Sequence, residues 1–255
     1  KPGGVSIDIL PCESWKDLID SWKRSGMKWG EGLDIFFSCM LATCTSTESV
    51  GDPLWVKGIS PPSTGKSILC EALAVNRKYI YPKDTLTGLF SGYQTDKMGT
   101  EDFSLIAKLL NKTLVIKDGD TLLSNPGLPQ ILSELRDVYD TSARTSYRNR
   151  TSRAYQGVRM SIILCGTESL RVLNRSELGE RFLDTVIVDE IDEEQEDRIG
   201  KRVAREAARS VRLESDGRPE THESPERTRV KQLTGGYVQW LRGNASSLVG
   251  PVVDA

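Results

Sequence analysis

The sequence predicts an α/β fold in which a parallel β-sheet lies between two layers of helices. Short apolar runs alternate with helical patterns between residues 54 and 188, and strands joined through helices pair in parallel. One apolar run leads through a loop rich in Pro and Ser (60–67) into a helical pattern. From about residue 190 the character changes to acidic, charged and helical stretches, which we expect to form a separate part.

The composition is that of an ordinary globular protein. The chain has 255 residues, of which 38% are hydrophobic and 27% charged, enough for one large domain or two small ones. A formal net charge of -2 excludes a protein coated in basic residues, so any nucleic-acid contact must come from a local patch or from assembly around a channel. No apolar run is long enough to cross a membrane, and we expect no membrane partner.

The cysteines and the histidine narrow the chemistry further. Five Cys residues occur without a C-x-x-C pair, and two of them lie inside apolar runs, which is typical of buried free thiols in a reducing compartment. The single histidine, His222, lies in a polar stretch. This argues against catalysis by histidine and against a His-rich metal site.

The individual elements follow in order along the chain. Residues 11–47 are expected to be helical, with Ser14 as the N-cap of a first helix. Asn125 is the expected cap of a later helix. Strands are expected at 54–57, 77–81, 113–117, 159–165 and 184–188, and helices at 65–75, 102–110, 126–140 and 230–242.

The most informative stretch is 60–67, which ends in Gly-Lys-Ser. A strand before it and a helix after it are the setting of a phosphate-binding P-loop. Backbone N–H groups of such a loop point at the phosphates, and the helix dipole favours their negative charge. Lys66 would contact the outer phosphates and the Ser67 hydroxyl would ligate magnesium. The expected nucleotide contacts are Pro62, Ser63, Thr64, Gly65, Lys66, Ser67 and Ile68.

The alternative for this stretch is a turn of the same composition that happens to end in Gly-Lys-Ser. The loop resembles the G-P-P-G-T-G-K-[ST] loop of the AAA+ ATPases, with Ser60 and Ser63 in place of two glycines. We expect a serine there to avoid the positive φ that glycine adopts. The resemblance implies ATP and Mg2+ as ligands. It also implies three parts: an N-terminal helical segment (1–50) beside the nucleotide, a three-layer P-loop NTPase core (51–190), and a small helical lid (191–255) with a flexible charged loop at 213–229.

A second acidic element is expected at the end of another strand. Asp118 follows the apolar run 114–116 and Lys117, and is the Walker B candidate that would hold Mg2+. AAA+ ATPases usually carry glutamate directly after this aspartate, where it activates the attacking water, but this chain has Gly119. Asp120 is our candidate for that catalytic role. An ordinary turn is the alternative for both acids, because Asp-Gly is a favoured turn pair.

The resemblance assigns catalytic roles to two more residues. Thr167, after the fourth expected strand, corresponds to the polar sensor 1 residue that positions water near the γ-phosphate; a helix cap is the alternative. Arg181 resembles the arginine that reaches the γ-phosphate of the neighbouring subunit, with Arg175 in reserve. The alternative for Arg181 is a surface ion pair with Glu177 or Glu180.

A basic stretch precedes the fourth expected strand. Residues 141–155 hold four Arg and two Tyr among Ser, Thr and Asn. Arginines bind phosphates and tyrosines stack on bases, and ring helicases carry a hairpin at this position that projects into the central channel. A solvated loop, or one that pairs with the acidic segment 189–197 of another subunit, is the alternative. The candidate nucleic-acid contacts are Arg144, Tyr147, Arg148, Arg150 and Arg153.

Together these features predict an ATPase that assembles as a homo-oligomer, a hexameric ring, and moves on single-stranded or forked DNA as a helicase. Residues 54–188 resemble ATPase domains of phages and mobile elements, many of which are replication or primase–helicase proteins. A cytoplasmic location in a bacterial or phage-infected cell is implied. A second interpretation is a nucleotide-gated switch or assembly ATPase with slow hydrolysis, for example in a defence system, which Gly119 favours. A small-molecule kinase built on the same P-loop is a third.

Overall fold

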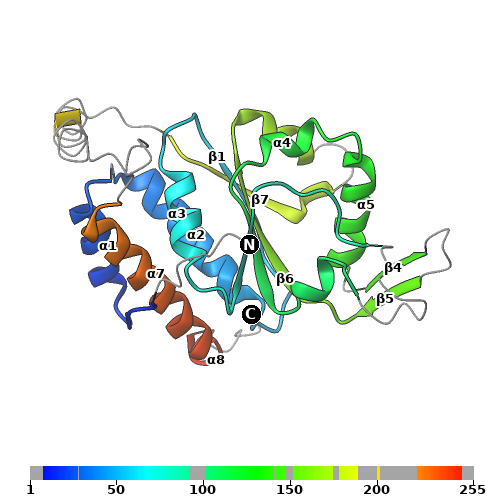
Figure 1. The fold of residues 1–255 in the computed structure, drawn as a ribbon, viewed down its shortest axis with the longest axis horizontal. Helices are drawn as coiled ribbons and strands as arrows, with labels where there is room; N and C mark the ends of the chain where they lie inside the picture. The colour runs from blue at the N-terminus through cyan, green and yellow to red at the C-terminus, as the bar shows by residue number, and fades with distance from the viewer. Residues whose placement is uncertain are drawn as a thin grey trace, which may run out of the picture.

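A five-stranded sheet forms the centre of the molecule, with helices on both of its faces (Figure 1). The computed structural model describes residues 8–27, 29–91, 102–140, 142–146, 152–174, 178–188, 200–201 and 223–248. The strand order is β2-β3-β6-β1-β7, and all four pairings are parallel. The predicted α/β class with a parallel sheet is therefore confirmed.

The elements have the following bounds. The strands of the main sheet are β1 (Trp55–Ile59), β2 (Ile80–Lys83), β3 (Lys112–Ile116), β6 (Met160–Gly166) and β7 (Phe182–Val186). The hairpin strands β4 (Ser142–Ser146) and β5 (Ser152–Gln156) pair antiparallel. The α-helices are α1 (Trp15–Arg24), α2 (Glu31–Ser46), α3 (Lys66–Leu73), α4 (Asp120–Leu123), α5 (Leu128–Tyr139), α7 (Pro225–Gly243) and α8 (Ala245–Leu248). The 3-10 turns are η1 (Ile106–Lys108), η2 (Glu168–Asn174) and η3 (Gly179–Arg181).

The central strands divide their side chains between two hydrophobic cores. In β1, Val56 belongs to the core under α1, α2, α3 and α7, whereas Trp55 belongs to the core under α5. In β6, Ile163 and Ile162 are divided in the same way. Successive side chains of a strand point to opposite faces, so a strand that is apolar at every position needs cover on both faces. These sequences therefore specify the interior of a three-layer fold.

The long helix α7 packs in the same layer as α1, α2 and α3 (Figure 1). Asn76 Nδ2, just after α3, donates a hydrogen bond to the Gly235 carbonyl oxygen at 2.9 Å. A Cβ atom at Gly236 would overlap the Leu10 carbonyl oxygen, so glycine lets α7 approach the segment before α1. Helix α7 thus rests on the core, and the role of 191–255 as a lid stays a prediction.

Several local predictions can be compared with the observed backbone. The Ser14 cap is confirmed, because its Oγ accepts a hydrogen bond from the Asp17 N–H at 3.2 Å. The strand predicted at 77–81 begins only at Ile80, since the Tyr79 N–H bonds back to the Asn76 carbonyl in a turn.

Two predicted helices are shorter than expected. The helix predicted at 102–110 is reduced to η1, whose first N–H bonds to the Leu89 carbonyl instead of to a preceding helical turn. The helix predicted at 126–140 begins at Leu128, because Asn125 Oδ1 accepts from the Gly127 N–H at 2.8 Å and holds these residues in a turn.

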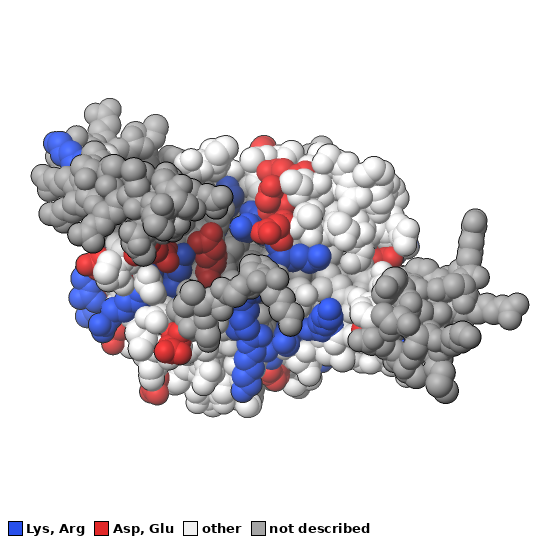
Figure 2. Space-filling model, viewed as in Figure 1, with Lys and Arg blue, Asp and Glu red and all other residues white. Residues whose placement is uncertain are grey.

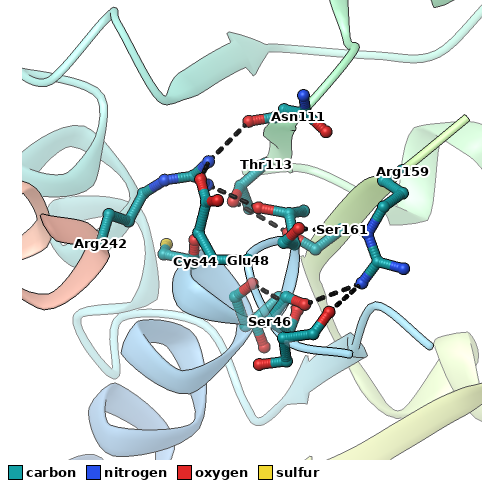
Figure 3. A network of polar contacts seen from close by, with 11 residues as sticks. Cys44, Ser46, Glu48, Asn111, Thr113, Arg159, Ser161 and Arg242 are labelled. Carbon is teal, nitrogen blue, oxygen red and sulfur yellow. Dashed lines mark hydrogen bonds and ion pairs between the residues drawn. The ribbon is translucent and has the colours of Figure 1, made fainter. Parts of the chain in front are cut away.

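Two arginines close the amino end of the sheet (Figure 3). The Arg242 side chain on α7 is 2% exposed, pairs with Glu48, and donates to the carbonyl oxygens of Cys44 and Asn111, both at 2.9 Å. Arg159, just before β6, donates to the carbonyl oxygens of residues 49 and 51 at 2.6 and 2.7 Å. Each arginine satisfies backbone groups of segments that are far apart in the sequence, which fixes their positions.

Candidate nucleotide-binding site

The carboxyl ends of β1, β3 and β6 meet at one edge of the sheet. The Ser60 N–H, just after β1, donates to the Gly166 carbonyl oxygen at 3.3 Å, and the Gly119 N–H, after β3, donates to the Cys165 carbonyl oxygen at 2.6 Å. Ligands of open α/β sheets bind outside the carboxyl ends of the strands, where the chain reverses its direction across the sheet. Loop 60–65 occupies this position.

The backbone of this loop has two residues with positive φ. Gly65, the N-cap of α3, has φ +93°, and a Cβ atom there would overlap the Met27 methyl group. Ser63, where the AAA+ pattern has glycine, has φ +67°. Our expectation that this serine avoids positive φ is wrong: it keeps a left-handed conformation, which costs about 1–2 kcal/mol in a residue with a side chain. The loop therefore holds a shape that its sequence does not favour locally.

Lys66 turns its side chain back into the loop. The residue is 9% exposed, and its Nζ donates to the carbonyl oxygens of Ser60 and Pro61 at 2.9 and 3.0 Å and contacts the Ser60 hydroxyl. Burial lowers the pKa of Lys66, while the nearby Cys165 and Asp120 act in the opposite direction. The ammonium group is thus largely removed from water and bonded mainly to oxygens of its own loop.

Asp120 and Thr167 are brought together across β3 and β6. The Asp120 carboxylate accepts hydrogen bonds from the Thr167 N–H at 2.9 Å and the Thr167 hydroxyl at 3.1 Å. The Ser169 hydroxyl donates to the same carboxylate at 2.6 Å. Sequence reasoning named Asp120 and Thr167 but not Ser169, which lies two residues beyond Thr167. The three donors fix the carboxylate at the edge where loop 60–65 lies.

Two glycines lie where the ends of β3 and β6 approach each other. A Cβ atom at Gly119 would lie 2.6 Å from Leu164 Cδ1 and 3.0 Å from the Cys165 carbonyl oxygen, so a glutamate there would require Leu164 to move. A Cβ atom at Gly166 would lie 3.0 Å from Asp120 Oδ1. The missing side chains let the β3 end and the β6 end approach each other, with Asp120 between them.

The two residues predicted to hold magnesium are both exposed. Ser67 lies in the first turn of α3. The Asp118 carbonyl oxygen accepts a hydrogen bond from the Thr121 hydroxyl at 2.9 Å. Within the described ranges, no group of three or more His, Cys, Asp or Glu lies together as a metal site. Mg2+ that is bound with a nucleotide needs only one or two protein ligands, since phosphates and waters supply the rest. The residues present fit that arrangement.

Arg181 is held within its own chain. Its guanidinium donates to the Leu178 carbonyl oxygen at 3.0 Å and pairs with Asp140 at 3.2 Å. It also lies 5.3 Å from the centre of the Tyr139 ring. An intrachain ion pair was the alternative in the sequence, and among the described residues its partner is Asp140, the C-cap of α5, rather than Glu180. Arg175 and Glu177 lie outside the described residues.

The basic stretch forms the hairpin β4–β5, which stands off from the body beside α5 (Figure 1). Arg144 is exposed, whereas Arg153 lies 3.6 Å from Asp102. Tyr155 also donates its hydroxyl to Asp102, and burial followed by this bond raises the pKa of Tyr155 to about 12. Asp102 therefore anchors the base of the hairpin. The predicted contacts Tyr147, Arg148 and Arg150 lie outside the described residues.

One buried ion pair was not predicted from the sequence. Lys57 in the middle of β1 is fully buried, pairs with Asp184 on β7 at 2.9 Å, and donates to the Leu170 carbonyl oxygen at 3.1 Å. Burial lowers the pKa of Lys57, which the bond to Asp184 partly offsets. The signal was a lysine inside the apolar run Trp-Val-Lys-Gly-Ile. This pair ties the strand before loop 60–65 to the strand that follows Arg181.

The chain matches no protein-family model, and no curated protein sequence is significantly similar to it. The resemblance to the AAA+ ATPases therefore rests on the motifs in the sequence. None of the helices in the described ranges is both long and apolar enough to span a membrane.

Proposed function

We propose that the chain binds ATP with Mg2+ and hydrolyses it as an AAA+-like motor, working as an oligomeric ring on DNA. The observation that supports this most is the state of Lys66: a buried lysine at the start of α3, enclosed by a loop with positive-φ residues at the carboxyl end of a central parallel strand. A turn that ended in Gly-Lys-Ser by chance would leave such a lysine in solvent.

The proposed binding step exchanges one set of oxygens for another. Lys66 now donates to the carbonyl oxygens of Ser60 and Pro61. Phosphate oxygens would replace these acceptors, and hydrogen bonds between charged partners are roughly twice as strong as neutral ones. The N-terminal N–H groups of α3 would add to the attraction for the phosphates. Ser67 and Asp118 would hold the magnesium that neutralises phosphate charge.

In the proposed hydrolytic step, Asp120 orients the attacking water and accepts its proton. Its carboxylate is fixed by Thr167 and Ser169, so its position does not depend on the substrate. A positioned general base contributes about 100-fold or more to a rate. Thr167 acts through Asp120 here, in addition to the direct role near the γ-phosphate that the resemblance implies.

Arg181 would complete the site of a neighbouring subunit. To do so, the Arg181 guanidinium has to leave its ion pair with Asp140, whose side chain is 58% exposed, and contact the γ-phosphate bound to the neighbouring subunit. Exposed ion pairs contribute at most about 1 kcal/mol, so this exchange costs little.

The test is ATP turnover with and without single-stranded DNA. Wild type should turn over faster with DNA, and Lys66→Ala and Arg181→Ala should each be inactive. A mixture of the two variants should recover part of the activity, because some sites then combine an intact loop with an intact arginine. The exposed Lys108→Ala serves as a control that should match wild type. The motor proposal fails if DNA leaves turnover unchanged and the mixture stays inactive.

A nucleotide-gated switch is the second candidate. Two observations favour it: glycine stands at position 119, where the usual glutamate would overlap Leu164, and Arg181 is bonded within its own chain. A switch would bind ATP through Lys66 but hydrolyse it slowly, with or without DNA. The same turnover experiment distinguishes the two.

A further inference from the structure

A cavity of about 240 Å3 lies between α3 and the edge strand β2, separate from loop 60–65. Charged side chains surround it: three cations, Arg77, Lys83 and Lys117, and two acids, Glu71 and Asp84. In Figure 2, blue and red side chains lie beside one another near the centre of the face shown.

The acids of this cavity already have partners. Asp84 pairs with Lys117 at 3.0 Å, and Glu71 pairs with Lys231 of α7 at 2.8 Å. Arg77 and Lys83 form no ion pair within the part of the chain that the structure describes. Lys231 also pairs with Glu223 at 2.6 Å, so two acids share it. The lining of three cations and two acids therefore carries a net charge of +1, and Arg77 and Lys83 are its two cations outside these ion pairs. An anionic ligand would balance that charge.

The size and lining of the cavity limit the ligand. Pockets for drug-sized molecules begin at about 300 Å3, so this one suits a smaller molecule. The lining residues Val115 and Cys70 are buried, and the Cys70 thiol contacts the Cys165 thiol at 3.4 Å. These residues form the inner wall of the cavity, and the charged side chains therefore lie at its mouth. Arginine presents paired N–H groups that match phosphate oxygens, and lysine adds a point charge.

We propose that this cavity binds the phosphate group of a small anionic ligand, at a site distinct from the phosphate site of loop 60–65. Arg77 and Lys83 hold the phosphate, and Lys117 remains paired with Asp84. The wall that carries Cys70 and Glu71 is one turn along α3 from Lys66. A ligand in the cavity therefore contacts the same helix that begins at the nucleotide loop. The proposal does not depend on ATP hydrolysis.

The test measures binding of inorganic phosphate by calorimetry, at an ionic strength kept constant with chloride. All proteins carry Lys66→Ala, so that loop 60–65 does not contribute. In this background phosphate should bind, and adding Arg77→Gln with Lys83→Gln should weaken binding by roughly tenfold or more, as expected when two charge-assisted contacts are lost. Adding the control pair Lys108→Gln and Arg136→Gln, which also removes two positive charges at exposed positions outside the cavity, should leave the affinity unchanged. Circular dichroism confirms that each variant is folded, and Arg77→Gln alone, at an exposed side chain, replaces the double variant if that does not fold.

Two results would overturn the proposal: no phosphate binding in the Lys66→Ala protein, or binding that is as tight without Arg77 and Lys83 as with them. A parallel titration with oligothymidylate distinguishes a free anion from the backbone of a nucleic acid. If only the oligonucleotide binds, and does so through Arg77 and Lys83, the phosphate chemistry is supported and the small ligand is excluded.

Discussion

The two ends of the central sheet hold their buried cations in different ways. At the amino end, Arg242 of α7 donates to the Cys44 and Asn111 carbonyl oxygens and pairs with Glu48, so its partners come from separate parts of the chain (Figure 3). At the carboxyl end, the hydrogen bonds of the Lys66 ammonium go to oxygens of its own loop. The first arrangement joins the fold together, whereas the second leaves a cation whose partners a ligand can replace.

The largest effect expected from this comparison is on stability. Arg242→Met leaves Glu48 and two carbonyl oxygens without their buried donor, so we expect the free energy of unfolding to fall by about 3–5 kcal/mol. Urea denaturation measures this. Arg136→Met, at an exposed position on α5, should change stability by less than about 0.5 kcal/mol. Equal losses in the two variants would show that Arg242 does not join these segments.

The next effect is on catalysis and concerns Asp120. Asp120→Asn should lower the single-turnover rate of ATP hydrolysis by about 100-fold, because an amide cannot accept the proton of the attacking water. Asp118→Asn is the matched variant, and we expect it mainly to raise the Mg2+ concentration that is needed. If Asp118→Asn abolishes hydrolysis at saturating Mg2+ and Asp120→Asn does not, the roles are reversed.

Gly119 provides a test of the backbone at this edge. Gly119→Ala places a Cβ atom against Leu164 and the Cys165 carbonyl, so we expect a loss of about 1–3 kcal/mol in the free energy of unfolding. Gly51→Ala, where a Cβ atom would meet nothing within 4 Å, is the control and should be close to neutral. A neutral Gly119→Ala would mean that the two strand ends are not in close contact.

The hairpin arginines should differ in their effect on DNA binding. Arg144 is exposed, so Arg144→Ala should reduce the slope of log affinity against log salt by about one unit or slightly less. Arg153 lies near Asp102 at the hairpin base, so Arg153→Ala should also lower the thermal stability of the protein. Filter binding at several salt concentrations measures the first effect, and a salt slope unchanged in both variants would exclude Arg144 and Arg153 as DNA contacts.

The smallest effect is on the pH dependence of stability. Burial lowers the pKa of Lys66 below 10.5, so the unfolded chain binds this proton more tightly than the folded protein does. The loss of stability caused by burying the charged ammonium group is fully present below the pKa that Lys66 has in the folded protein. It decreases as pH rises from that pKa towards 10.5. Wild type should therefore gain stability relative to Lys66→Met between neutral and alkaline pH. A constant difference, measured by urea denaturation at several pH values, would indicate an ammonium group that stays solvated.

The sequence predicted the sheet well because a strand that is apolar at every position must be covered on both faces. A sheet between two layers of helices provides that cover. The sequence also singled out loop 60–67 and Thr167, which directly follow β1 and β6, and Asp120, which lies four residues after β3; their functional roles stay predictions. It did not predict the left-handed Ser63, because local preference disfavours that conformation and only the surrounding loop enforces it. Partners such as Lys57 with Asp184 depend on strand order, which no local pattern contains.

We expect Lys66 to be a ligand-binding cation and not a structural one. Calorimetric titration with a non-hydrolysable ATP analogue and Mg2+ tests it directly on wild type, Lys66→Ala and Lys108→Ala. We expect wild type and Lys108→Ala to bind alike, and folded Lys66→Ala to lose binding by at least about 100-fold, as for the loss of a buried charge-assisted contact. Equal binding by Lys66→Ala and wild type would contradict the account.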